Sequence, residues 1–208
     1  MDTENKPQIT PLDNGPLRVE GMTGIKTRDG MIDLKPKVHL CRCGRSANKP
    51  FCDGKHKENG FNTAKSEDRP KDKSHNYRGA NISVHFNLGV CIHSGQCIGT
   101  LPSVFNLKAK PWIQPDNADV EEVIKTVNNC PSGALGYTID DENELDNSFD
   151  CSIYMLPNGP FLITGDIKLE NTEFGDGTKS SRYALCRCGQ SKNKPFCDGA
   201  HHQVKFEE

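Results

Sequence analysis

The stretch CRCGRSANKPFCDGKH, at residues 41–56, returns as CRCGQSKNKPFCDGAH at residues 186–201, with 13 of 16 positions identical. We call residues 41–56 the first knuckle and residues 186–201 the second knuckle. Each knuckle offers three thiols and one imidazole, which is the donor count of a protein metal site. The repeat therefore predicts two metal sites, with these eight donors: Cys41, Cys43, Cys52, His56, Cys186, Cys188, Cys197 and His201.

The repeat extends upstream of both knuckles. ITPLDNGPLRVEG at residues 9–21 matches IYMLPNGPFLITG at residues 153–165, and both share Leu-x-Asn-Gly-Pro. Asn-Gly between two short β-type runs predicts a hairpin. The repeating unit is thus a strand, a turn, a second strand, a variable loop and a knuckle.

Spacing within each knuckle predicts local structure. The third Cys and the His are four residues apart, which on a helix places both donors on one face. Asp53 and Asp198 stand where a carboxylate could cap the first turn of such a helix. Gly54 and Gly199 leave room for backbone near a metal.

Both knuckles fit the pattern C-x-C-x2-S-x3-P-x-C-D-G-x-H, which resembles the CDGSH iron–sulfur domain family. The match departs from the family's usual residues at Lys55. The resemblance implies one 2Fe–2S cluster per knuckle, with the C-x-C thiolates on an inner iron and the third Cys and the His on an outer iron. It also implies small β-rich units that pair about a two-fold axis, here as an intramolecular pseudo-dimer.

Two other uses of these cysteines stay open on sequence alone. Three Cys and one His could hold a structural zinc ion, although zinc sites normally use C-x2–4-C instead of C-x-C. An even number of cysteines, ten in this chain, would also suit disulfides. The N-terminus lacks the basic and apolar regions of a secretory signal, and no run approaches the ~18 apolar residues of a membrane span. We therefore expect a soluble cytoplasmic protein with reduced thiols.

Two polar stretches, residues 65–76 and 140–150, read as linkers. They divide the chain into a first knuckle unit at 1–64, a middle module at 77–139 and a second knuckle unit at 151–208. In the middle module, residues 82–86 and 134–139 are strand candidates. Apolar residues at i, i+3, i+4 and i+7 predict an amphipathic helix beginning near Val120, with Asp119 and Glu122 as a capping box.

The middle module carries a third set of thiols. CIHSGQC at residues 91–97 and the later Cys130-Pro131 resemble a divergent, single-cluster 4Fe–4S ferredoxin domain, in which Ser94 occupies one usual Cys position. Three thiols, Cys91, Cys97 and Cys130, suit a 3Fe–4S cluster directly. A 4Fe–4S cluster needs a fourth donor, for which His93 is the best candidate by chemistry. Ser94 and the leftover Cys151 are the alternatives.

We expect an α+β protein: a β-rich pseudo-two-fold pair of knuckle units with a small ferredoxin-like module between them. No phosphate loop, nucleophile–base set or dinucleotide fingerprint appears, which favours a monomeric electron carrier over an enzyme. Its partners would be a reductase and an acceptor. A net charge of −2 gives no argument for nucleic acid, and no membrane contact is expected. Cluster transfer or redox and iron sensing is the alternative function, ahead of a zinc-stapled interaction module.

Basic residues near the knuckles have two interpretations. They could offset the charge of a cluster or face an acidic redox partner, and a merely solvated face is the plain alternative. The residues concerned are Arg42, Arg45, Lys49, Arg187, Lys192 and Lys194.

Iron and acid-labile sulfide, counted per chain with a visible spectrum, test the three-cluster prediction. We expect about eight irons if the middle site is 4Fe–4S and about seven if it is 3Fe–4S, because the knuckles add two 2Fe–2S clusters. Colourless protein containing zinc after anaerobic expression would contradict the prediction.

Overall fold

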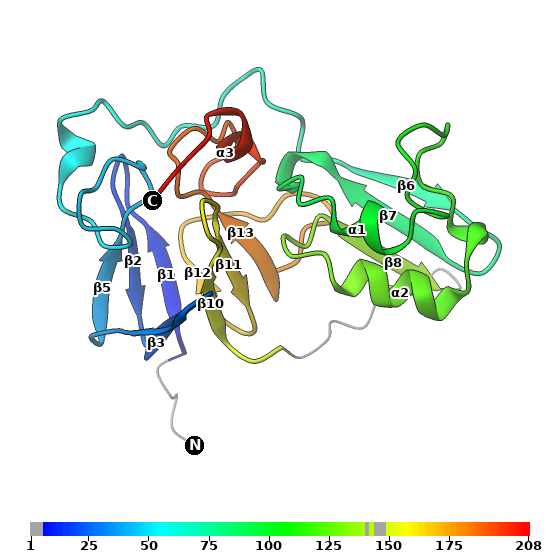
Figure 1. The fold of residues 1–208 in the computed structure, drawn as a ribbon, viewed down its shortest axis with the longest axis horizontal. Coiled ribbons are helices and arrows are strands. Elements are labelled where there is room, and N and C mark those ends of the chain that lie inside the picture. Colours follow the sequence, from blue (N-terminus) through cyan, green and yellow to red (C-terminus); the bar gives the residue numbers. More distant parts are fainter. Residues whose placement is uncertain (1–5, 140–141, 144–148) are drawn as a thin grey trace.

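A computed structural model describes residues 6–139, 142–143 and 149–208. The chain is β-rich, as expected, and forms two neighbouring parts (Figure 1). Two sheets built from the repeats lie on one side, and the middle module lies on the other. Among the described helices, none has the length and apolar character needed to cross a membrane.

The predicted hairpins are present in both repeats. In the first, β1 (Gln8–Pro11) pairs antiparallel with β2 (Leu17–Glu20), and in the second, β10 (Ser152–Met155) pairs with β11 (Phe161–Thr164). Asn14 and Asn158 take positive φ values of 46° and 50° in the two turns, which asparagine tolerates better than most residues. Strands β5 (Lys37–Leu40) and β13 (Arg182–Leu185) then pair with β2 and β11 and lead directly into the knuckles.

Each repeat also gives a strand to the other repeat's sheet. Strand β3 (Gly24–Thr27), which pairs with β4 (Gly30–Asp33), lies parallel to β10 of the second repeat. In return, β12 (Lys168–Leu169) lies parallel to β1 of the first repeat. The sheet orders are therefore β12-β1-β2-β5 and β13-β11-β10-β3-β4. Neither sheet belongs to one repeat alone.

A single hydrophobic core joins the two repeats. Ile9, Val19 and Ile25 from the first repeat pack in the same buried cluster as Phe161 and Tyr183 from the second. Because burial of apolar surface is the main stabilising term in folding, the two halves depend on each other for stability.

The middle module forms its own antiparallel sheet and core. The sheet order is β6 (Ser74–Arg78), β7 (Ser83–Asn87), β8 (Leu135–Ile139) and β9 (Glu142–Asn143). Helix α2 (Val120–Asn128) packs on this sheet through the buried Val123 and Val127, which confirms the helix expected from apolar spacing. Short helices α1 (Gln96–Thr100), η2 (Leu88–Val90) and η3 (Pro115–Asn117) complete the module.

Two local predictions in and around this module were wrong. Asp119 precedes α2, but its side chain makes no capping hydrogen bond; the amides of Glu122 and Val123 bond to its main-chain oxygen instead. The stretch read as a linker, 65–76, already contains the start of β6 at Ser74. Most of the acidic stretch 140–150 lies outside the described residues.

The two knuckles meet through their backbones. Cys43 and Cys188 form an isolated antiparallel bridge, and Gly44 and Gly189 follow them with φ values of 76° and 78°. A β-carbon at either glycine would lie 2.6 Å from the opposite cysteine's carbonyl oxygen. Only glycine permits this approach, because it has no side chain and tolerates the left-handed conformation.

Gly44→Ala tests that contact, with Gly60→Ala as the matched control. Gly60 has a similar φ of 66°, but nothing lies within 4 Å of the position that a β-carbon would take there, so both variants share the left-handed strain of roughly 1–2 kcal/mol. We expect Gly44→Ala to lower the free energy of unfolding by about 1–3 kcal/mol more than the control, because it also overpacks the bridge. Thermal unfolding followed by circular dichroism measures the difference, and equal losses would contradict the contact.

Candidate metal centres

The first two thiols of each knuckle lie side by side and are buried. They follow β5 and β13 directly, and the amides of Cys41 and Cys186 bond to the carbonyls of Pro50 and Pro195, at 2.8 and 2.9 Å. In the first knuckle, the Sγ atoms of Cys41 and Cys43 are 3.7 Å apart. In the second, the Sγ atoms of Cys186 and Cys188 are 3.8 Å apart. We call these the inner pairs.

The third thiol and the imidazole form an outer pair in each knuckle. Cys52 Sγ lies 3.3 Å from His56 Nδ1, and Cys197 Sγ lies 3.4 Å from His201 Nδ1. The predicted proximity is thus confirmed, but only the histidines are helical. Glycines with φ of 91° and 86° separate the cysteines from the short helices η1 (Lys55–Lys57) and α3 (Ala200–Gln203).

The aspartate of each knuckle holds the outer pair's turn in place. Asp53 accepts hydrogen bonds from the amides of Ala47 and Lys55, at 2.8 and 3.1 Å, and these bonds hold its carboxyl pKa below the usual value. Asp198 accepts the equivalent bonds from Lys192 and Ala200. Each carboxylate therefore satisfies the first helical amide, as predicted, although the residue at the cap position is glycine.

The spacing within each pair fits one tetrahedral metal ion. With metal–sulfur bonds of about 2.3 Å and metal–nitrogen bonds of about 2.0–2.1 Å, two thiolates on one ion lie about 3.8 Å apart, and a thiolate and an imidazole about 3.5 Å apart. The inner pairs and the outer pairs are close to these separations. Within the described residues, which include all eight donors, no three His, Cys, Asp or Glu side chains gather closely enough to hold a single ion.

In each inner pair, one thiol has a lowered pKa and so loses its proton more easily than a free cysteine. A hydrogen bond from the neighbouring thiol lowers the pKa of Cys43 to about 5 and that of Cys186 to about 7. The other thiol of each pair, Cys41 in the first knuckle and Cys188 in the second, has a raised pKa because it holds the shared proton. Burial also lowers the pKa of His201 to about 4, which keeps the ring neutral, the form that binds metal.

Arg42 and Arg187, which stand between the two inner-pair cysteines in sequence, bond to backbone carbonyls of their own repeat. Arg42 donates to the carbonyl oxygens of Gly15 and Leu12 in the first hairpin turn. Arg187 donates to the carbonyl oxygen of Leu156 in the second turn. Both side chains are buried, so each ties its knuckle to its own hairpin. The sequence signal for this structural role was that the same position holds arginine in both repeats.

Three thiols line one cavity in the middle module. The cavity has a volume of about 410 Å³, and Cys91, Cys97 and Cys130 all contribute to its wall. Burial, together with the nearby charges of the other two thiols, raises the pKa of Cys91 to about 11. A cation bound among these thiols would favour their thiolate forms. Phe86, Leu135 and Trp112 supply much of the remaining wall.

Trp112 is a packing residue in the wall of this cavity. Its ring packs edge-on against Phe86 at 5.0 Å, and its Nε1 donates to the Tyr77 hydroxyl at 2.8 Å. Ser132, which the sequence did not single out, is buried with its Oγ 3.9 Å from Cys130 Sγ.

The three candidates for a fourth middle donor lie in different places. His93 and Ser94 both line the cavity and are exposed. Cys151 is exposed beside β10 and does not contribute to the cavity wall. Of the two that line the cavity, only His93 is a strong metal donor at neutral pH.

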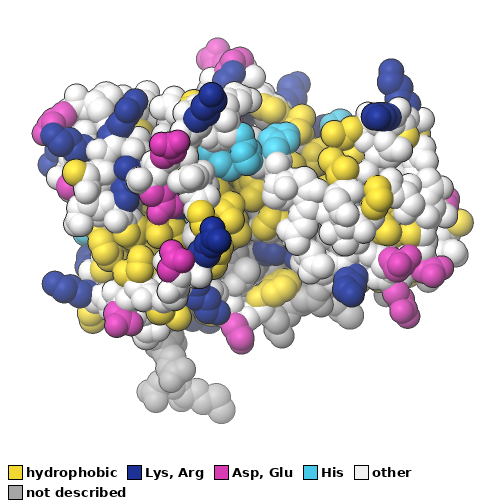
Figure 2. All heavy atoms as spheres, in the orientation of Figure 1, with side chains coloured by type: hydrophobic (Ala, Val, Ile, Leu, Met, Phe, Trp, Pro, Cys, Tyr) yellow, Lys and Arg dark blue, Asp and Glu magenta, His cyan; other side chains and the backbone are white. Residues whose placement is uncertain are grey.

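The middle cavity adjoins the second knuckle's outer pair. His202 Nε2 lies 3.1 Å from the carbonyl oxygen of Ile92, next to Cys91 in the cavity wall. A β-carbon on Gly199 would lie 2.4 Å from the His93 ring. Figure 2 shows histidine side chains gathered on this face, between the repeats and the middle module. The Cys91–His93 segment thus carries candidate donors of the middle site. The same segment touches the Gly199–His202 turn, which carries the imidazole of the second knuckle's outer pair.

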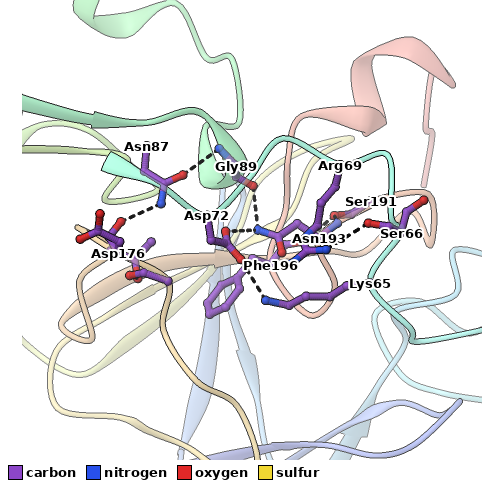
Figure 3. Close-up of polar contacts among 12 residues, drawn as sticks. Lys65, Ser66, Arg69, Asp72, Asn87, Gly89, Asp176, Ser191, Asn193 and Phe196 are labelled. Atoms are coloured by element: carbon purple, nitrogen blue, oxygen red, sulfur yellow. Dashed lines mark hydrogen bonds and ion pairs between the residues drawn. The ribbon is translucent and has the colours of Figure 1, made fainter. Parts of the chain in front are cut away.

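A buried polar network fixes this contact (Figure 3). The fully buried Asn193 donates to Asp72 Oδ1 at 2.8 Å and to the carbonyl oxygen of Gly89 at 2.9 Å. Lys65 pairs with Asp72, and the amide of Ser66 bonds to the carbonyl of Lys192. The segment read as a linker is therefore part of the interface between the second knuckle and the middle module.

Comparison with known proteins agrees with this geometry. A family profile described as "Iron-binding zinc finger CDGSH type" matches residues 14–57 and 158–202, and another described as "Divergent 4Fe-4S mono-cluster" matches residues 77–140. The chain belongs to the CDGSH family, with a divergent 4Fe–4S domain between its two CDGSH regions. Both matches describe iron-binding domains, so this is an iron–sulfur protein.

Two curated relatives carry the same name. "Uncharacterized protein YjdI" of Escherichia coli strain K12 and that of strain O157:H7 are each 52% identical to this CDGSH protein over 61 residues. The matched region is 29% of this chain and 80% of each relative. That name says nothing about activity.

The two CDGSH knuckles differ in how far they shield their outer donors. Cys197 and His201 are 1% and 5% exposed, whereas Cys52 and His56 are half-buried. We expect an iron chelator to remove metal from the first knuckle at least several-fold faster than from the second. Cys52→Ser should abolish the fast phase of iron loss from the knuckles, and Cys197→Ser the slow phase. Equal rates for the two single-site variants would contradict the difference in shielding.

Proposed function

We propose that this CDGSH protein is an electron carrier with two 2Fe–2S clusters and one further cluster. The first 2Fe–2S cluster would use Cys41, Cys43, Cys52 and His56. The second would use Cys186, Cys188, Cys197 and His201. The observation that carries this proposal is the grouping of the eight donors into four pairs, each spaced for one tetrahedral ion.

Pairing favours a two-iron cluster over zinc. A mononuclear zinc site brings all four donors to one ion, so three or more donors would have to lie together. A 2Fe–2S cluster instead takes two protein donors on each of two irons, and sulfide ions fill the space between them. Free thiols at all ten cysteines, every one in the described part of the chain, also fit a reducing compartment such as the cytoplasm and not a disulfide framework.

The two knuckle units would form a pseudo-two-fold pair. Reciprocal exchange of β3 and β12 supports this arrangement, since each repeat adds a parallel strand to the other's hairpin. The contacts at the bridge are also matched: Gly44 approaches Cys188 as closely as Gly189 approaches Cys43.

For the middle site, the arrangement favours Cys91, Cys97 and Cys130 with His93 as the fourth ligand of a 4Fe–4S cluster. A 3Fe–4S cluster on the three thiols is the alternative. His93 lines the cavity with the thiols, which supports the first choice. An electron paramagnetic resonance signal near g = 2 from the oxidised protein would favour the second.

The position of these sites supports a role in electron transfer. When bound, such clusters accept and release single electrons at little structural cost. The residues of this chain supply short connections: the Cys91–His93 segment touches the Gly199–His202 turn, and the inner pairs meet at the Cys43–Cys188 bridge. The proposed carrier would take electrons from a reductase and pass them to an acceptor, without substrate chemistry of its own.

Cluster donation or sensing is the second candidate function. The observation that favours it is the half-buried outer pair of the first knuckle, because an iron held by Cys52 and His56 would be accessible to solvent.

Mixing the reduced protein with an apo-ferredoxin separates the two functions. The carrier proposal predicts rapid, reversible reduction and oxidation with all iron retained, while the apo-ferredoxin stays colourless. Iron and sulfide appearing in the ferredoxin at the expense of this protein would favour the donor function instead. Colour and iron content of the two proteins after separation give the answer, and a colour-retaining, redox-inert protein would contradict the carrier.

A further inference from the structure

The surroundings of the two knuckles differ more than their sequences. The outer pair of the second knuckle is covered: Asn193 is fully buried against Asp72 and Gly89, and His202 bonds to the middle module. The position equivalent to Asn193 in the first knuckle is Asn48, which is exposed. The outer pair is thus enclosed in the second repeat and partly open to solvent in the first.

Three sequence differences between the repeats add basic residues to the first knuckle unit, while a fourth, Ala47 against Lys192, places one in the second, where it pairs with Asp68. Where the second knuckle unit has Gln190, Ala200 and His202, the first has a basic residue at each position. These residues are Arg45, Lys55 and Lys57, and all three are exposed. His202 is also exposed, but its Nε2 bonds to the carbonyl oxygen of Ile92, so this side chain is engaged by the middle module.

The basic residues lie close in sequence to the first knuckle's donors, two of them beside its half-buried outer pair. Lys55 and Lys57 flank His56 on helix η1, and Arg45 follows the inner pair. Lys55 pairs with Glu58, and Asp53 is engaged by two backbone amides. Arg45 and Lys57 make no ion pair with any described residue. Figure 1 places η1, the short cyan helix, at the end of the molecule away from the middle module.

From this contrast we infer that the first knuckle is the docking site for an acidic redox protein, whereas the second knuckle exchanges electrons only within the molecule. The inference rests on the proposed electron transfer. Positive charges around an exposed redox centre steer a negatively charged partner and orient it towards the metal. The second knuckle needs no such charges, because its neighbour is already fixed in place by Asn193 and His202.

Small charged oxidants test the docking site on the fully reduced full-length protein. Stopped-flow oxidation by ferricyanide, an anion that takes one electron to become ferrocyanide, is compared with oxidation by the cation hexaammineruthenium(III). We expect ferricyanide to react faster at low salt and to slow as salt rises from 0.01 to 0.15 M, over which the Debye length falls from about 30 to about 8 Å. The cation should show the opposite salt dependence.

A variant that gives the first knuckle unit the residues of the second provides the decisive comparison. Arg45→Gln, Lys55→Ala and Lys57→His together should slow ferricyanide oxidation roughly tenfold at low salt. The matched control removes three exposed basic residues near β3 and β4, with Arg28→Gln, Lys26→Ala and Lys35→His, and should keep the wild-type rate. Reduction potentials, measured separately, correct each rate for driving force.

Carbodiimide cross-linking to poly-L-glutamate gives a readout that is independent of electron transfer. Mass spectrometry should find Lys49, Lys55 and Lys57 linked ahead of Lys26 and Lys35. Even labelling, or a control variant as slow as the first-knuckle variant, would overturn the docking site. If neither oxidant reacts with the reduced protein, the proposed carrier function fails instead, and the cross-links then report only an anion-binding surface.

Discussion

The antiparallel bridge between Cys43 and Cys188 determines where the proposed metal ligands of both repeats lie. Two of these cysteines meet there backbone to backbone, and the glycines after them leave no space for a side chain. From this contact the inner pairs extend into the two knuckles. Arg42 and Arg187 then connect each knuckle to its hairpin turn, so a change at the bridge affects ligands and sheets together.

Because the repeats exchange strands, each repeat also depends on the other to complete its sheet and the shared core. Strands β3 and β12 are short, and each pairs with a strand of the other repeat. Ile25 on β3 is fully buried in the common core. The chain is poor in apolar residues, and it meets this scarcity by pooling the two repeats into one core, with metal binding as a further source of stability.

Local features were predictable from sequence because their causes are local. Donors two or four residues apart must lie close together, Asn-Gly turns form hairpins, and the apolar face of α2 needs only its own spacing. The exchange of β3 was not predictable, because GIKT has no pattern that specifies a partner more than a hundred residues away. The polar stretch 65–76 was read as a linker for a related reason: Asp72 is polar because it bonds to buried Asn193, not because it is solvated.

Two nearly identical knuckles thus acquire different environments from what packs beside them. The structure separates an enclosed knuckle, next to the middle cavity, from an open knuckle at the far end. The grouping of donors into pairs is common to both, and anomalous X-ray diffraction at the iron edge tests it most directly. Our account predicts two iron peaks per knuckle, one at the inner pair and one at the outer pair. A single metal peak among the four donors of either knuckle would contradict it.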